Sequence, residues 1–143
     1  MVIEDGEFGS SEQRGAAIEN KGQLTINGGK FTSLEKGSDN WNGYAYVFIN
    51  RGDDNAIMTI NNATSDCNAH GMFSAETGVI NVNGGTYRLG KQGLSTYYMA
   101  HVTDGIINLN SGTFNWTSGA TNFPTYIGGN GSVNISENAK INW

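Results

Sequence analysis

The sequence predicts an all-β chain that forms a single parallel β-helix, a solenoid of about six stacked coils. Three observations predict it. A strand-like octapeptide recurs six times, the same residue types return at the same places in each copy, and the chain has 21 Gly and 19 Asn but one Pro. Gly and Asn suit tight turns, and 143 residues suit one domain, which is expected to span residues 1–143.

The six copies align without gaps. They are MVIEDGEF (1–8), LTINGGKF (24–31), MTINNATS (58–65), INVNGGTY (80–87), INLNSGTF (107–114) and VNISENAK (133–140). The first and third residues of every copy are apolar, and the residue between them is mostly polar. This period of two predicts a strand with one buried face. The third residues are spaced by 23, 34, 22, 27 and 26 positions: Ile3, Ile26, Ile60, Val82, Leu109 and Ile135.

A turn follows each strand. Asparagine comes directly after the third residue in four copies, at Asn27, Asn61, Asn83 and Asn110, and glycine comes two residues later at Gly6, Gly29, Gly85 and Gly112. An aromatic residue then follows at Phe8, Phe31, Tyr87 and Phe114, with Ser65 and Lys140 as exceptions. Gly22, Gly78, Gly105 and Gly131 precede the strand, with Gly52 displaced by an insertion. Each coil is therefore expected to hold at least two strands, two tight turns and one variable loop.

Such short strands cannot bury an apolar face alone, whereas stacked coils would place equivalent residues about 4.8 Å apart in one core. A β-sandwich would not need the same residue type at the same place in every copy. A leucine-rich repeat protein is also disfavoured, because the leucine and asparagine pattern of such repeats is absent. We expect the turn asparagines to form hydrogen-bonded ladders along the axis. The alternative is that they only tolerate left-handed turn geometry at the surface.

The copies of the pattern x-φ-N-G-G-x-F/Y resemble the right-handed parallel β-helix, or pectate-lyase-like, superfamily, and the resemblance covers nearly the whole chain. It implies a right-handed solenoid similar to phage tailspike or bacterial surface adhesin modules. Members typically bind or cleave polysaccharides along the outer flank. Lyases of this superfamily use a cluster of stacked aspartates and a basic residue, and neither can be matched in this sequence. The resemblance therefore assigns no catalytic residue to this chain.

Net charge limits the partners. The chain has 8 basic and 13 acidic residues, a net charge of −5. Because nucleic acids and anionic membranes attract basic surfaces, we expect neither as a partner. Cys67 is the only cysteine and forms no intrachain disulfide, and no apolar run has the length of a membrane span. Met1 stands directly before a repeat already in progress, which is typical of a fragment of a longer chain.

Catalytic signals are weak. Glu76 and Asp104 each precede the recurring glycine, one coil apart, and are the carboxylate pair considered for acid and base roles. Cys67, His70 and Asp66 lie close in sequence but fall short of a metal site, so no metal or other cofactor is expected. We interpret the RGD tripeptide at 51–53 as turn chemistry. The sequence favours a protein without enzymatic activity and does not decide the question.

Three variable loops leave the coil at the same point and are expected on one flank. They are rich in aromatic, amide and basic side chains, which suit the apolar faces and hydroxyl rims of sugars. The alternative is that these aromatics cover the solenoid. The predicted ligand-binding residues are Trp41, Tyr44, Arg88, Tyr97, Tyr98, Trp116 and Tyr126.

Three functions remain open at this stage. The first is a noncatalytic recognition or adhesion module that binds a polysaccharide or glycan, as in a phage fibre or bacterial adhesin, at an extracellular surface or on a virion. The second is a polysaccharide lyase or glycoside hydrolase, and the third is a purely structural spike or decoration protein. Because an open solenoid exposes strand edges, a homotrimer or an adjoining domain is expected.

Overall fold

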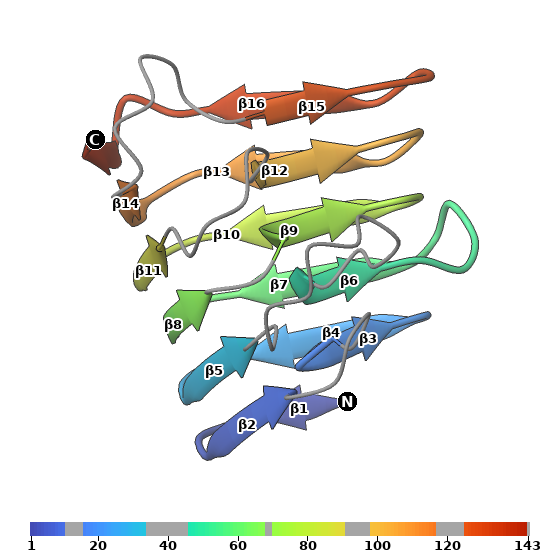
Figure 1. Cartoon of the computed structure of the whole chain (residues 1–143). Helices are drawn as coiled ribbons and strands as arrows, with labels where there is room; N and C mark the ends of the chain where they lie inside the picture. Colours follow the sequence, from blue (N-terminus) through green and yellow to red (C-terminus); the bar gives the residue numbers. More distant parts are fainter. Residues whose placement is uncertain (11–15, 34–45, 68–69, 91–97, 117–124, 143) are drawn as a thin grey trace.

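The structure is a computed structural model that describes residues 1–10, 16–33, 46–67, 70–90, 98–116 and 125–142. It contains three parallel sheets that run side by side along the solenoid axis (Figure 1). We call the sheets A, B and C, in the order in which the chain passes through them. Each coil contributes one strand to each sheet, except that the last coil contributes strands to sheets A and B only. The predicted all-β parallel solenoid of about six coils is confirmed.

Sheet A contains the strands that the repeat predicts. Its strands are β1 (Val2–Ile3), β4 (Gln23–Ile26), β7 (Ile57–Ile60), β10 (Val79–Val82), β13 (Ile106–Leu109) and β16 (Ser132–Ile135). Ile26 pairs with Ile60, Ile60 with Val82, and Val82 with Leu109. All four are fully buried, so equivalent residues stack in one interior column despite their unequal spacing in the sequence.

Sheet B follows the turn after each sheet A strand. Its strands are β2 (Glu7–Ser10), β5 (Lys30–Ser33), β8 (Thr64–Cys67), β11 (Thr86–Leu89), β14 (Gly112–Trp116) and β17 (Ala139–Asn142). The turn glycine has a left-handed φ in four coils, 138° at Gly6, 113° at Gly29, 107° at Gly85 and 119° at Gly112. Glycine is favoured there because a Cβ would be strained at these angles.

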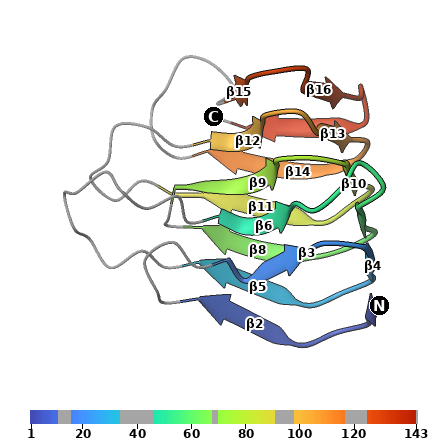
Figure 2. The same cartoon turned by 90° about the vertical axis from the view of Figure 1, so that its right-hand side faces the viewer.

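Sheet C completes each coil. Its strands are β3 (Ile18–Asn20), β6 (Tyr46–Asn50), β9 (Gly71–Ala75), β12 (Tyr98–Val102) and β15 (Thr125–Ile127). The internal gaps between described residues all fall between a sheet B strand and the next sheet C strand. The first five coils thus have three strands each, where the sequence required at least two. Figure 2 shows the strands of successive coils lying side by side.

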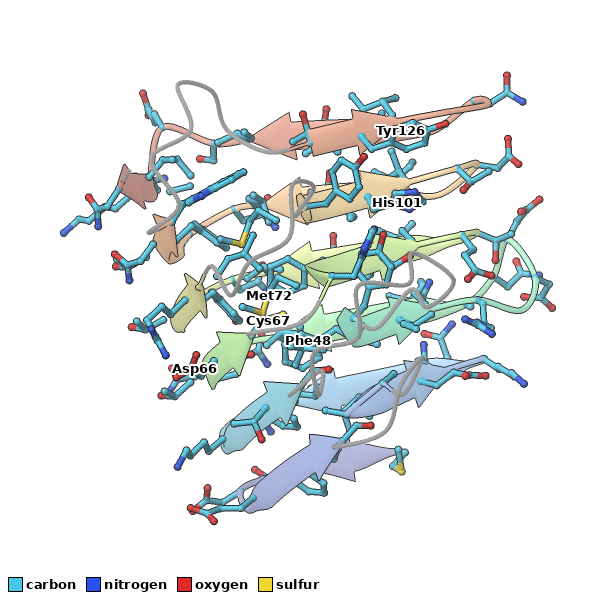
Figure 3. All side chains as sticks on the ribbon, in the orientation of Figure 1. Phe48, Asp66, Cys67, Met72, His101 and Tyr126 are labelled. Atoms are coloured by element: carbon cyan, nitrogen blue, oxygen red, sulfur yellow. The ribbon has the colours of Figure 1, made fainter. Side chains whose placement is uncertain are left out.

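Stacked aromatic rings fill the interior between sheets B and C. Phe8 lies on Phe31 with centroids 5.0 Å apart, and Tyr87 lies on Phe114 at 5.2 Å. Ser65 interrupts this column, but its hydroxyl donates to the Phe31 carbonyl at 3.0 Å. Met72 fills the space beside Ser65, with its Sδ 3.1 Å from the Ser65 oxygen. Figure 3 shows Met72, Phe48 and Cys67 between the sheets.

Lys140 is the second residue that interrupts the predicted aromatic column, and the reason is the length of the turn that precedes it. Phe114 pairs with Ile141, and Lys140 pairs with Thr113. The turn before β17 is therefore one residue longer than the turn before β14. The interior position remains apolar, and the gapless alignment of the last copy is wrong beyond its strand.

The predicted asparagine ladder is present. Asn61 donates to Asn27 at 2.8 Å, Asn83 to Asn61 at 3.0 Å, and Asn110 to Asn83 at 2.9 Å. Asn27 donates to Glu4 at the first coil. The side-chain amides therefore link four successive turns. A mere tolerance of left-handed turn geometry at the surface does not explain these bonds.

Candidate functional site

Five rings gather at the outer face of sheet C, and we call them the ring cluster. Ala100 and Val102 belong to the core, and because strand residues alternate between faces, His101 between them points outward. His101 pairs with Tyr126 in the next coil, and Figure 3 shows the two side chains one above the other. The members of the ring cluster are Tyr46, His70, Tyr98, His101 and Tyr126.

The rings contact one another across four coils. His101 and Tyr126 are stacked, with centroids 4.7 Å apart and planes at 11°. Tyr98 contacts Tyr126 edge-on at 5.9 Å and His101 at 5.6 Å. Tyr46 reaches both His70 at 5.4 Å and His101 at 5.5 Å. Such ring pairs add to the energy of burial and hold each ring in one orientation.

A glycine permits this arrangement. Gly71 lies between Tyr46 and Tyr98 in the sheet register. A Cβ at Gly71 would lie 2.7 Å from Cδ1 of Tyr46 and 2.6 Å from the Tyr98 carbonyl oxygen. The absence of a side chain therefore lets the Tyr46 ring cross the third coil and reach His101 in the fourth.

Burial within the ring cluster decreases along the axis. Tyr46 is 3% exposed and His70 is 8% exposed, whereas Tyr126 is 46% exposed. One face of the Tyr126 ring lies on His101, so its solvent contact belongs mainly to the opposite face and the ring edge. The Tyr46 end is therefore structural, and the Tyr126 end is accessible to a ligand.

Burial sets the charge of the two histidines. It lowers the pKa of His70, and the neighbouring His101 lowers it further. Burial also lowers the pKa of His101, while the Glu76 carboxylate acts in the opposite direction. Both imidazoles are thus neutral at pH 7. The His101 Nδ1 atom has no hydrogen-bond partner among the described residues.

The turn between sheets C and A carries an ion-pair network beside the ring cluster. Arg51 lies 2.9 Å from Glu76 and 3.7 Å from Glu19, and Lys21 lies 3.0 Å from Glu19. The adjoining Asp53 accepts a hydrogen bond from the Asn55 amide at 2.9 Å, so the RGD tripeptide is part of a turn. These contacts bind successive coils together at this corner.

The two candidate catalytic carboxylates lie on adjacent coils with different partners. Glu76 pairs with Arg51, whereas Asp104 accepts a hydrogen bond from the Asn130 amide at 3.0 Å. The backbone amide of Asp104 donates to the Glu76 carbonyl, which confirms that the residues are neighbours along the axis. Each carboxyl group has a structural role in the corner that it occupies.

The predicted ligand-binding residues divide among three places. Tyr98 and Tyr126 come together in the ring cluster. Arg88 lies on sheet B, where it pairs with Asp66 of the preceding coil. Trp116 pairs in register with Leu89 and packs against the core, and its Nε1 has no hydrogen-bond partner in the described part of the chain. Trp41, Tyr44 and Tyr97 lie outside the described residues.

Sequence reasoning missed Tyr46, His70 and His101 as members of one cluster. The histidines are 31 residues apart, and nothing in a single coil brings them together. A signal was present in the stretches YYMAHV and TYIGG. Aligning His101 with Tyr126 requires one extra residue before the recurring glycine of the last coil, which the repeat alignment did not include.

Among the described residues, no group of three or more His, Cys, Asp or Glu side chains converges as metal ligands. Cys67 is buried, and its thiol donates to the Gly71 carbonyl at 3.1 Å. An open groove of about 470 Å³ lies at the opposite corner, between sheets A and B, and is lined by backbone, Asp5, Glu7 and Lys30 among others. It contains none of the predicted ligand-binding residues.

Comparison of the chain with protein-family models, with curated proteins and with solved structures finds no match. In the described segments, no helix is long and apolar enough to cross a membrane. The functional interpretation therefore rests on the fold and on the ring cluster.

Proposed function

We propose that the protein is a noncatalytic recognition module that binds a glycan at the exposed end of the ring cluster. The observation that carries the proposal is the Tyr126 ring, which is held by His101 at 4.7 Å and is 46% exposed. A fixed aromatic face suits the apolar C–H face of a sugar, because little side-chain entropy is lost on binding.

The chemistry around Tyr126 favours an uncharged glycan. Both histidines are neutral at pH 7, and the nearest ion-pair network contains the Glu76 and Glu19 carboxylates. An anionic sugar would find no free cation in the ring cluster as described. The Tyr98 edge and the His101 imidazole offer polar groups for sugar hydroxyls.

The same proposal includes the superfamily and the location of the protein. We infer membership of the right-handed, pectate-lyase-like superfamily from the repeat pattern, and a location at an extracellular or virion surface, where glycans are accessible. Trp41, Tyr44 and Tyr97 lie outside the described residues and remain proposed ligand-binding residues, because they come shortly before sheet C strands in the sequence.

A glycan array followed by titration of the best neutral oligosaccharide tests the proposal. Tyr126→Ala should weaken binding about tenfold, which corresponds to about 1.4 kcal/mol. Ile106→Ala is the matched control, because Ile106 is an exposed apolar residue on sheet A, away from the ring cluster. Equal affinity of both variants, or cleavage of the oligosaccharide by the wild-type protein, would refute the proposal.

A further inference from the structure

Columns of like side chains run along the outer face of sheet A. Four successive coils contribute β4, β7, β10 and β13, and each of these strands has a neighbouring strand on both sides. Ile57, Val79 and Ile106 are paired in register and alternate with buried residues, so they point outward. They form an aliphatic column, in which Ile106 is 37% exposed.

A second column lies beside the aliphatic one. It contains Thr25, Thr59, Asn81 and Asn108, which are also paired in register. Asn108 donates to Asn81 at 2.8 Å. The branched threonines have few rotamers, and the asparagines are held by their hydrogen bond. The side chains of this column therefore have fixed positions.

The turn ladder adds a third column. Asn27, Asn61, Asn83 and Asn110 come two positions after the second column, and all four are exposed. A side-chain amide has two N–H donors, and its oxygen has two lone pairs. Within the described chain the ladder uses one of each at Asn61 and at Asn83, which leaves one donor and one lone pair on each for an external partner.

The three columns form a regular array. Neighbours within a column lie about 4.8 Å apart, and adjacent columns lie about 6.6 Å apart, which is two residues along a strand. Figure 1 shows the four strands stacked one above another and pointing the same way. Because each strand is paired in register with the next, the array repeats in both directions across the face.

The array carries no charge. None of the outward side chains of these four strands is acidic or basic, and the third column is asparagine throughout. The outer face of sheet B, in contrast, carries Lys30, Asp66 and Arg88, and sheet C carries Glu19. In a chain of net charge −5, a face without ionic groups favours a partner that is itself uncharged.

We propose that the outer face of sheet A binds the surface of an ice crystal. The water molecules of an ice surface repeat over comparable distances in two directions, are uncharged, and present both donors and acceptors. The threonine and asparagine columns supply matching hydrogen-bonding groups, and the aliphatic column excludes unordered water beside them. Because these side chains are already fixed, little entropy is lost on binding. The inference is independent of the proposed glycan binding, which uses sheet C.

Thermal hysteresis tests the proposal; it is the gap between the melting and freezing points of a single ice crystal in the protein solution. The wild-type protein should open a gap and give the crystal flat facets. Thr59→Lys should abolish both effects, because it places a cation and a long side chain within the array. Thr86→Lys is the matched control, because Thr86 lies in register between Thr64 and Thr113 on sheet B; it should retain the gap.

Two further variants make the test independent of a single substitution. Ile106→Lys changes an exposed side chain of the same array and should also abolish the gap. Tyr126→Ala, which alters the exposed end of the ring cluster, should leave the gap unchanged. Circular dichroism checks that each variant is folded.

Several results would overturn the proposal. The first is a wild-type protein that neither opens a gap nor shapes the crystal, and the second is an equal gap for Thr59→Lys, Ile106→Lys and Thr86→Lys. Cosedimentation with crystalline cellulose or chitin, without an effect on ice, would assign the array to a polysaccharide surface instead. A wild-type dimer that Thr59→Lys dissociates would assign it to a second copy of the chain.

Discussion

The asparagines of the turn between sheets A and B differ in burial from those of the corner between sheets C and A. Asn83 lies in the exposed turn ladder, between Asn61 and Asn110. Asn50 is fully buried at the corner between sheets C and A, where its amide donates to the carbonyls of Ala56 and Thr77, both at 3.0 Å. Asn20 donates to the Asn50 oxygen at 2.7 Å, so these internal asparagines also link successive coils.

Asn50→Ala should lower the free energy of unfolding by about 2–3 kcal/mol, because it leaves buried polar groups without a partner. Asn83→Ala, in which water can replace the lost partners, should cost only about 0.5–1 kcal/mol. Urea denaturation of both variants measures the difference. Equal costs would show that burial does not distinguish Asn50 from Asn83.

Gly71→Ala should destabilise the protein by about 1–3 kcal/mol, because the new methyl group overlaps the Tyr46 ring and the Tyr98 carbonyl. Gly22→Ala is the control: a Cβ at Gly22 meets no heavy atom within 4 Å, and its effect should stay within about 0.5 kcal/mol. Thermal denaturation compares them, and a neutral Gly71→Ala variant would mean that Tyr46 does not cross the third coil.

At the scale of the elements, the regularity of each sheet determines how much of it could be predicted. Sheet A alternates buried and half-buried residues, as β7 and β10 show, so its strands and their stacking follow from the sequence. In sheet C, every residue of β6 and β9 is buried. Without alternation, and with turns of varying length, neither its register nor the ring cluster could be derived from spacing.

The predicted binding residues illustrate the same limit. Tyr98 and Tyr126 contact each other, because both lie near the start of strands that follow the variable loops, and their role in binding stays a prediction. Trp116 carries the same kind of side chain at a strand end, yet it packs against the core. Composition identified the aromatic residues, but only the direction of each side chain separates a surface ring from an interior one.

The ring cluster should make stability depend on pH. The folded-state pKa values of His70 and His101 are lowered, so their contribution is fully present above the unfolded value of about 6.5 and is lost as pH falls below it. The free energy of unfolding should decrease between about pH 7.5 and about pH 5.5. The facing ionisable groups in the described chain are Tyr46, Tyr98, Tyr126 and Glu76.

The control for this effect is the double variant His70→Asn, His101→Gln, which removes both titrating groups. Its free energy of unfolding should change less over the same pH range than that of the wild-type protein. An unchanged slope, or a wild-type protein that gains stability on acidification, would contradict the assignment of neutral, buried imidazoles.

At the scale of the whole molecule, one geometric property supports the proposed function. Equivalent residues of successive coils stack in register, and this brings Tyr126 onto His101. The unequal sequence separations between coils are taken up at the corners, mainly between sheets B and C. The ring cluster therefore depends on the in-register stack.

Electron paramagnetic resonance between pairs of spin labels on the outer face of sheet A tests this claim most directly. One label stays at Asn134, and the other moves from Thr59 to Thr25 to Val2, which lie three, four and five strands away in the sheet order. Unlabelled protein is added in excess to suppress distances between molecules. The in-register stack predicts mean distances that increase by about 4.8 Å per strand, to about 14, 19 and 24 Å. Distances that do not increase by equal steps, or that shorten along this series, would contradict it.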